Sequence, residues 1–207
     1  MSISTFDELK TSVADFLNRD DLTNVIPQFI KLAEARANRE IRHWRMEKRA
    51  TATLDTQFTS LPTDFLEAIR LTLNTPNTKP LEVAGNFEIA SIRSERANAA
   101  GEPQYYAIMD GAIEVNPTPD KAYTLEILYY STINPLSSSN TTNWLLTYHP
   151  DVMLYGALLH SAPYLGDDGR IAIWGAYYAS SIEALNRESE SATTGGAGRR
   201  MKIRSYG

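Results

Sequence analysis

Apolar residues recur at helical spacing at the start of the chain. The residues that share one helix face are Phe6, Leu9, Val13 and Phe16. Intervals of three to four residues predict an amphipathic helix, and the pair Ser4 and Asp7 is a weak capping-box signal at its start. A second helix is predicted from about Pro27, because proline suits the first helical turn, to about Met46. Its apolar stripe consists of Ile26, Phe29, Ile30, Ala33, Ala37, Ile41 and Trp44.

The period changes to two between about Ala50 and Tyr130. β-Branched and aromatic residues alternate with polar ones in the short runs 69–73, 113–115 and 123–129, a pattern typical of strands. Asp110 and Gly111 separate two apolar runs and predict a two-residue hairpin turn, because such a turn needs positive φ. A short helix is predicted around Phe87 to Glu95.

Helical spacing returns after a loop rich in Ser, Thr and Asn at 135–143. One helix follows this loop and is predicted to end at Pro163 and the Gly-Asp-Asp-Gly turn of 166–169. The last helix has an apolar side formed by Ile171, Trp174, Tyr178, Ile182 and Leu185. The pattern dissolves from Ser189, and a glycine-rich stretch at 195–198 predicts a flexible segment.

These elements predict an α+β fold in which N-terminal and C-terminal helices close one bundle around an inserted antiparallel β-rich domain. Chain ends of a domain usually lie close together, which allows helices before and after an insert to pack against each other. The predicted boundaries are 1–48 for the N-terminal helices, 49–135 for the insert, 136–188 for the C-terminal helices and 189–207 for an extended tail.

Composition narrows the functional classes. The 207 residues are 43% hydrophobic and 22% charged, which is ordinary for a globular protein. Cysteine is absent, which excludes disulfides and thiolate-bound metal and fits a reducing cytosol. No apolar run reaches the roughly 20 residues that a membrane helix needs, and the start of the chain has no apolar signal core. The net charge of -5 predicts no general attraction to nucleic acid.

Candidate catalytic and metal-binding residues are scattered. The three histidines are His43, His149 and His160. His43 lies four residues before Glu47, but zinc normally needs three or four ligands, so a solvated helix face is favoured there. We expect a capping or loop role for His149 and a satisfied buried or interface role for His160. No metal site, cofactor or catalytic residue is predicted, and the protein is expected not to be an enzyme.

The acidic pair before Gly169 is a second candidate for metal binding. Asp167 and Asp168 resemble part of a calcium loop, but such a loop needs oxygen ligands spread over about twelve residues. Arg170 and Ile171 follow at once. A turn with a helix N-cap is therefore favoured.

Two basic segments have more than one interpretation. The first lies on the second helix and consists of Arg36, Arg39, Arg42, Arg45, Lys48 and Arg49. These arginines could contact nucleic acid, form a subunit interface, or pair with the interleaved glutamates on a solvated face. The second segment is the tail, where four basic residues lie between 199 and 204 and no acidic residue follows Glu190. The tail could be a disordered end or a docking peptide that orders on a partner.

The order of short motifs along nearly the whole chain resembles the head-to-tail adaptor (connector) proteins of tailed phages. The motifs of the first half are Asn18-Arg19-Asp20-Asp21-Leu22, Ile26-Pro27, Phe29-Ile30, Ala33-Glu34, Asn38-Arg39 and Leu61-Pro62-Thr63-Asp64-Phe65. Those of the second half are Gly101-Glu102-Pro103-Gln104-Tyr105-Tyr106, Pro117-Thr118-Pro119-Asp120, Leu128-Tyr129-Tyr130, Asn143-Trp144-Leu145-Leu146 and His149-Pro150-Asp151. Each motif is weak alone, and their order and spacing carry the resemblance.

The resemblance implies a virion protein of the phage neck, made in the host cytoplasm, that forms a homo-oligomeric ring, usually a dodecamer, below the portal protein. The ring would join the capsid to a tail-side neck or nozzle protein and continue the DNA channel, with DNA passing through without sequence-specific binding and with no membrane contact. In such families the C-terminal segment reaches into the portal. This implies portal binding by Arg199, Arg200, Met201, Lys202, Ile203, Arg204 and Tyr206.

The arginines of the second helix allow two functional hypotheses. At a subunit interface, Arg36, Arg39, Arg42 and Arg45 would support the adaptor ring. On DNA, the same arginines would make the chain a nucleic-acid-binding accessory protein of the virion, with an affinity that falls steeply with salt.

Overall fold

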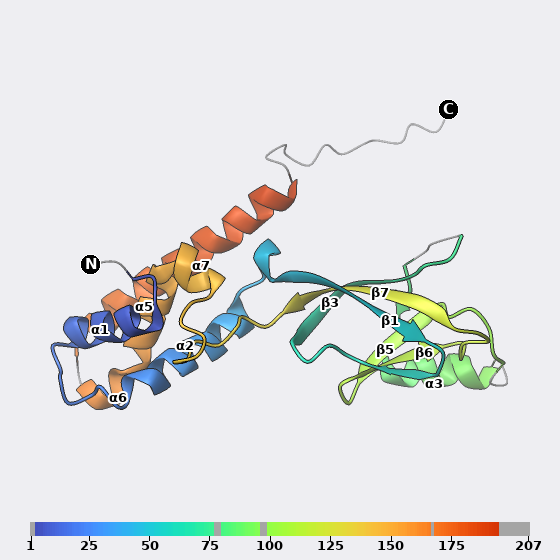
Figure 1. Cartoon of the computed structure of the whole chain (residues 1–207), viewed down its shortest axis with the longest axis horizontal. Helices are drawn as coiled ribbons and strands as arrows, with labels where there is room; N and C mark the ends of the chain where they lie inside the picture. Colours follow the sequence, from blue (N-terminus) through green and yellow to red (C-terminus); the bar gives the residue numbers. More distant parts are fainter. Residues whose placement is uncertain (1–2, 77–79, 96–98, 167, 195–207) are drawn as a thin grey trace. The chain divides into compact units, whose positions relative to one another are not determined.

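A computed structural model describes residues 3–76, 80–95, 99–166 and 168–194 of the chain. The chain divides into two compact units. The helical unit combines residues 1–45 with residues 133–207, and the insert unit spans residues 46–132 between them. Helices build the helical unit and mainly antiparallel strands build the insert unit (Figure 1), so the predicted α+β class is confirmed.

The first helix of the helical unit, α1 (Phe6–Leu17), begins with a capping box one residue later than predicted. Thr5 is the N-cap, and its hydroxyl accepts a hydrogen bond from the backbone N–H of Glu8. The Glu8 carboxylate in turn accepts the backbone N–H of Thr5 and of Ser4. The box therefore pairs Thr5 with Glu8, because the longer glutamate reaches back to the cap where Asp7 would fall short.

The second helix, α2 (Ile26–Glu40), ends six residues before the predicted Met46. Ile41 adopts an extended conformation, with φ at -100° and ψ at 133°, and its side chain is fully buried. A short 3-10 turn, η1 (Trp44–Met46), follows. The side chains of Ile41 and His43 both point into the core from this non-helical segment, since both residues are 0% exposed. The apolar positions used to predict the helix therefore extend beyond its actual end at Glu40.

Four helices complete the helical unit: α4 (Trp144–Tyr148), α5 (Pro150–His160), α6 (Ala162–Leu165) and α7 (Arg170–Thr194). Helix α5 is its central element, because it packs against α1, α2, α4 and α7. Gly156 of α5 packs closely against side chains of α2 and α7: a Cβ atom there would stand 3.0 Å from Cβ of Ala33 and 3.2 Å from Cε2 of Tyr178. Helix α7 continues past Ser189, where the sequence pattern dissolves.

The insert unit consists of two sheets and one helix. The first sheet has the order β1-β7-β3 and is antiparallel throughout, with β1 (Glu47–Leu54), β7 (Tyr123–Ser131) and β3 (Phe65–Leu73). The second has the order β2-β6-β5-β4, with β2 (Phe58–Ser60), β6 (Ala112–Asn116), β5 (Tyr105–Met109) and β4 (Glu82–Val83). In Figure 1, α3 (Asn86–Glu95) lies beside the second sheet, and it contacts β5 and β6.

The predicted hairpin lies between β5 and β6. Asp110 has φ at 49° and Gly111 has φ at 70°, as a two-residue turn with both central residues in the left-handed region requires. Met109 pairs with Ala112 directly across this turn. One apolar core joins the two sheets, because Leu71 and Ile127 of the first pack in the same cluster as Ile113 and Val115 of the second.

Both ends of the insert unit lie next to each other. Strands β1 and β7 pair from Glu47 opposite Tyr130 to Leu54 opposite Tyr123. The buried hydroxyl of Ser131 donates a 3.0 Å hydrogen bond to the backbone carbonyl of Met46. The chain therefore enters and leaves this unit through one pair of adjacent strand ends.

Candidate functional site

The predicted portal-binding residues, Arg199 to Arg204 and Tyr206, lie outside the described residues. The described chain ends at Thr194, the last residue of α7. The portal-binding assignment therefore stays a prediction.

The arginines predicted at a subunit interface are mostly engaged within their own chain. Arg36 Nε donates a 2.8 Å hydrogen bond to Glu40 Oε1, and its guanidinium lies 4.5 Å from the ring centre of Tyr178. The Arg45 guanidinium lies 3.9 Å from the ring centre of Tyr148. Arg42 is tied to the end of α2 through the carbonyl oxygens of Asn38 and Ile41, at 3.0 and 2.7 Å.

Arg39 differs from these three because it is exposed. The contacts of Arg36, Arg42 and Arg45 orient their guanidinium groups against the helical unit, which reduces the number of charges that α2 can offer to a phosphate backbone. The interface role of all four arginines is not tested by these contacts and stays a prediction.

Buried polar side chains of α2 hold the segment that returns from the insert unit. Asn38 Oδ1 accepts the backbone N–H of Ile133 at 2.8 Å, and Glu34 Oε1 accepts the backbone N–H of Leu136 at 2.7 Å. Glu34 is only 5% exposed. Burial raises the pKa of Glu34 to about 7, although the Leu136 hydrogen bond and the Lys31 charge act in the opposite direction.

We expect Glu34→Gln to stabilise the protein above neutral pH. A carboxyl whose pKa is raised on folding contributes stability below its unfolded pKa, near 4.5, and loses it as pH rises through about 7. Glutamine keeps the acceptor for Leu136 and removes the titration. The free energy of unfolding of the variant should exceed that of the wild type by up to about 3 kcal/mol at about pH 8 and match it below about pH 4.5.

Urea unfolding followed by circular dichroism across this pH range measures the difference. Glu183→Gln is the control for removing one negative charge, because Glu183 is an exposed carboxylate of α7 paired with Arg187 at 2.8 Å. If the free energy of unfolding of Glu34→Gln varied with pH as that of the wild type does, Glu34 would not have the raised pKa described above.

The structure gathers two histidines and one glutamate from three distant parts of the sequence, at positions 43, 149 and 188. His43 follows α2, His149 lies between α4 and α5, and Glu188 is on α7. Glu188 Oε1 is 3.8 Å from His43 Nε2, and Glu188 Oε2 is 3.7 Å from His149 Nε2. One ligand atom from each of the three residues lies within 4.8 Å of the other two. The prediction of His43 on a solvated helix face is therefore wrong.

Aromatic contacts fix the two imidazole rings. The His43 ring stacks on Trp144, with centroids 5.1 Å apart and an interplanar angle of 16°, and the His149 ring meets Trp144 edge-on at 6.2 Å. His43 Nδ1 accepts a 3.2 Å hydrogen bond from the backbone N–H of Arg45. Burial lowers the pKa of His43; the Glu188 charge partly opposes this, and the nearby charges of His149 and Arg45 add to the lowering.

The remaining candidates have structural roles. His160 is half-buried at the end of α5, and its Nε2 atom has no hydrogen-bond partner within the described part of the chain, so the interface role expected for it stays a prediction. The Asp168 carboxylate accepts the backbone N–H of Arg170 at 2.9 Å and pairs with the guanidinium of the same residue. This matches the turn at the start of α7 that was favoured over a calcium loop, while Asp167 lies outside the described residues.

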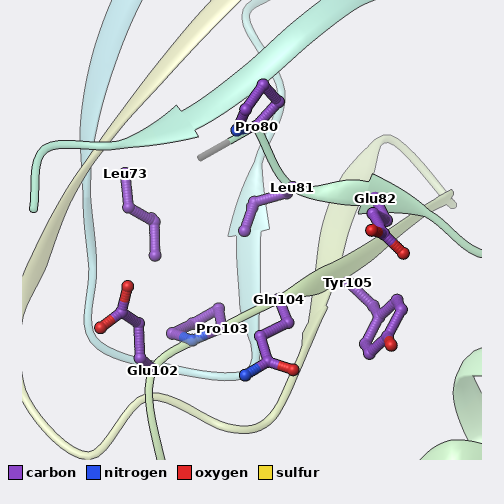
Figure 2. Close-up of a pocket in the computed structure, with 8 residues that line it drawn as sticks. All are labelled: Leu73, Pro80, Leu81, Glu82, Glu102, Pro103, Gln104 and Tyr105. Atoms are coloured by element: carbon purple, nitrogen blue, oxygen red, sulfur yellow. The ribbon is translucent and has the colours of Figure 1, made fainter. Parts of the chain in front are cut away.

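A pocket of about 400 Å³ opens on the insert unit. Figure 2 shows its lining, with Glu82 and Glu102 toward opposite ends. The other lining residues are Leu73, Pro80, Leu81, Pro103, Gln104 and Tyr105. The polar groups of this lining are two carboxylates, one amide and the Tyr105 hydroxyl.

The buried polar groups of the helical unit hold distant segments of the chain together. The chain belongs to the SU10 adaptor protein family, a family of phage head-to-tail adaptors whose family model matches residues 4–201. It is therefore a structural protein of the virion. No curated protein matches the chain. Within the described residues, no helix has the length and apolar character needed to cross a membrane.

Proposed function

We propose that the chain is one subunit of a ring, expected to be a dodecamer, that lies below the portal protein, joins the capsid to a tail-side neck protein and continues the DNA channel. The observation that carries this proposal is the family match, which spans residues 4–201 and so includes both units and the start of the basic tail.

The tail is the proposed portal anchor. Residues 199–204 combine four basic side chains with Met201 and Ile203, so the segment can pair with acidic groups and also fill apolar pockets. Ordering such a segment costs roughly 1–2 kcal/mol per residue in backbone entropy. Identical tails on one ring would raise the effective concentration of each, which makes weak individual docking sufficient.

Surface features support subunit contacts and a non-adhesive channel. Phe87 of α3 is 95% exposed and Val83 of β4 is 75% exposed, and aromatic side chains such as Phe87 are enriched in protein interfaces. We propose that Arg36, Arg39, Arg42 and Arg45 contribute to the contact between neighbouring subunits. The net negative charge of the chain suits DNA that must slide through, because strong phosphate pairing would retain it.

Reconstitution with portal rings tests the proposal. The purified full chain, mixed with assembled portal, should form a ring on one side of the portal that electron microscopy resolves. The same preparation should show weak binding to duplex DNA at low salt. A chain that leaves the portal bare and binds DNA with an affinity that falls steeply with salt would instead support the accessory nucleic-acid-binding function.

A further inference from the structure

The cluster of His43, His149 and Glu188 has the composition and spacing of a divalent metal site. Tetrahedral zinc sites place ligand atoms about 2.0–2.1 Å from the ion, so neighbouring ligand atoms lie about 3.4 Å apart. Glu188 Oε1 lies 3.8 Å from His43 Nε2 and Oε2 lies 3.7 Å from His149 Nε2, so each imidazole faces a different carboxylate oxygen at a distance within about 0.4 Å of this value. With one ligand atom taken from each residue, all three atoms lie within 4.8 Å of one another, and binding would draw them closer together.

The burial of the imidazoles points to a ligand. The His43 side chain is 0% exposed and that of His149 is 17% exposed. The Nε2 atoms of both residues are buried and make no hydrogen bond to any described residue. A buried polar atom without a partner is energetically unfavourable, and one ion between these two atoms would give both of them a partner.

The third ligand provides both adjustment and access. The Glu188 side chain is 48% exposed, so it can move toward the imidazoles and an ion can enter beside it. Its position along α7 is fixed by the neighbouring Ser189, whose hydroxyl oxygen accepts the backbone N–H of Trp44 at 3.0 Å. The carboxylate therefore stays close to the segment that carries His43.

We propose that His43 Nε2, His149 Nε2 and Glu188 bind a zinc-class divalent cation, with water as the fourth ligand. Two imidazoles and one carboxylate suit Zn²⁺ and its neighbours Co²⁺ and Ni²⁺, whereas Mg²⁺ and Ca²⁺ prefer oxygen ligands. The Arg45 N–H group now favours the His43 tautomer with hydrogen on Nε2. On binding, that hydrogen moves to Nδ1 and the 3.2 Å contact is given up, so a neutral imidazole ligates the ion.

The bound ion would be structural. It would connect the segment after α2, the start of α5 and the later turns of α7, three parts of the helical unit that come together only in the folded chain. Because the unfolded chain lacks this arrangement, the ion would bind the folded state preferentially and stabilise it.

Zinc titration of the untagged full chain tests the proposal after dialysis against EDTA. Calorimetry should show one Zn²⁺ bound per chain, the melting temperature should rise with zinc concentration, and Co²⁺ should give the visible absorption of a tetrahedral site. His149→Ala and Glu188→Gln should each weaken zinc binding by at least about tenfold. His160→Ala is the matched control, since its buried Nε2 also has no partner but lies outside the cluster, and it should bind zinc like the wild type.

Circular dichroism in EDTA establishes that each variant is folded. If His149→Ala is unfolded, the half-exposed Glu188→Gln variant decides the question. The proposal is overturned if the wild-type chain binds no zinc, or if Glu188→Gln binds zinc with wild-type affinity and an unchanged cobalt spectrum. It is independent of ring assembly, because the three ligands belong to one chain.

Discussion

Replacing Gly156 by leucine is expected to destabilise the helical unit by about 3 kcal/mol or more, because overpacking of a close helix contact forces side chains and backbone apart. A Cβ atom at this position would already stand 3.0 Å from Ala33 of α2 and 3.2 Å from Tyr178 of α7. The further atoms of leucine would separate α5 from both neighbours. The free energy of unfolding, measured by urea denaturation, gives the size of the effect.

Gly175→Ala is the control for helix propensity. A Cβ atom at Gly175 on α7 would meet only Leu159 Cδ2, at an ordinary 3.8 Å. Alanine should therefore stabilise the protein there by up to about 1 kcal/mol, the usual helix preference over glycine. A Gly156→Leu variant as stable as the wild type would show that α2, α5 and α7 do not pack as described.

Removing residues 195–207 is expected to abolish stable attachment to the portal while leaving both folded units intact. Under the proposed function, these residues carry the basic and apolar side chains that dock, and each attached subunit would lose its anchor. Portal rings incubated with the truncated chain should remain bare in electron micrographs and in co-sedimentation. Circular dichroism of the truncated chain should match that of the full chain, since the described helices end at Thr194.

Two variants with substitutions in the tail distinguish the contribution of its basic side chains to portal attachment from that of its apolar side chains. Replacing Arg199, Arg200, Lys202 and Arg204 by glutamine should weaken attachment most at low salt, because exposed ion pairs are screened as salt increases. Replacing Met201, Ile203 and Tyr206 by serine should weaken attachment at all salt concentrations. Normal occupancy of the portal by the truncated chain would refute the anchor role and direct attention to the folded units.

Local patterns predicted the fold well where one physical requirement dominates. The turn at Asp110 and Gly111 followed from the need for positive φ. Strand β7 followed from the period of two in the sequence at 123–129, and its buried and less buried side chains alternate in the structure. The end of α2 was harder, because Ile41 belongs to the apolar stripe and yet packs into the core from an extended backbone. Periodicity alone does not distinguish a helix from a buried segment that continues its register.

The cluster of His43, His149 and Glu188 could not be predicted from local sequence patterns, for a different reason. Its members lie at 43, 149 and 188, and helical spacing relates residues only within a few turns. The sequence did contain one signal, the His149-Pro150 step at a helix start, but not its partners. Only the packing of α5 against α2 and α7 brings segments so distant in the sequence together.

The adjacent strand ends of the insert unit have an evolutionary consequence. Glu47 pairs with Tyr130, and Ser131 is hydrogen-bonded to Met46. The distance between the points where the chain enters and leaves the insert unit is therefore fixed by these contacts and not by the length of the chain between them. The stretch from 47 to 131 can thus lengthen, shorten or be exchanged as a cassette while the helices on either side keep their connection.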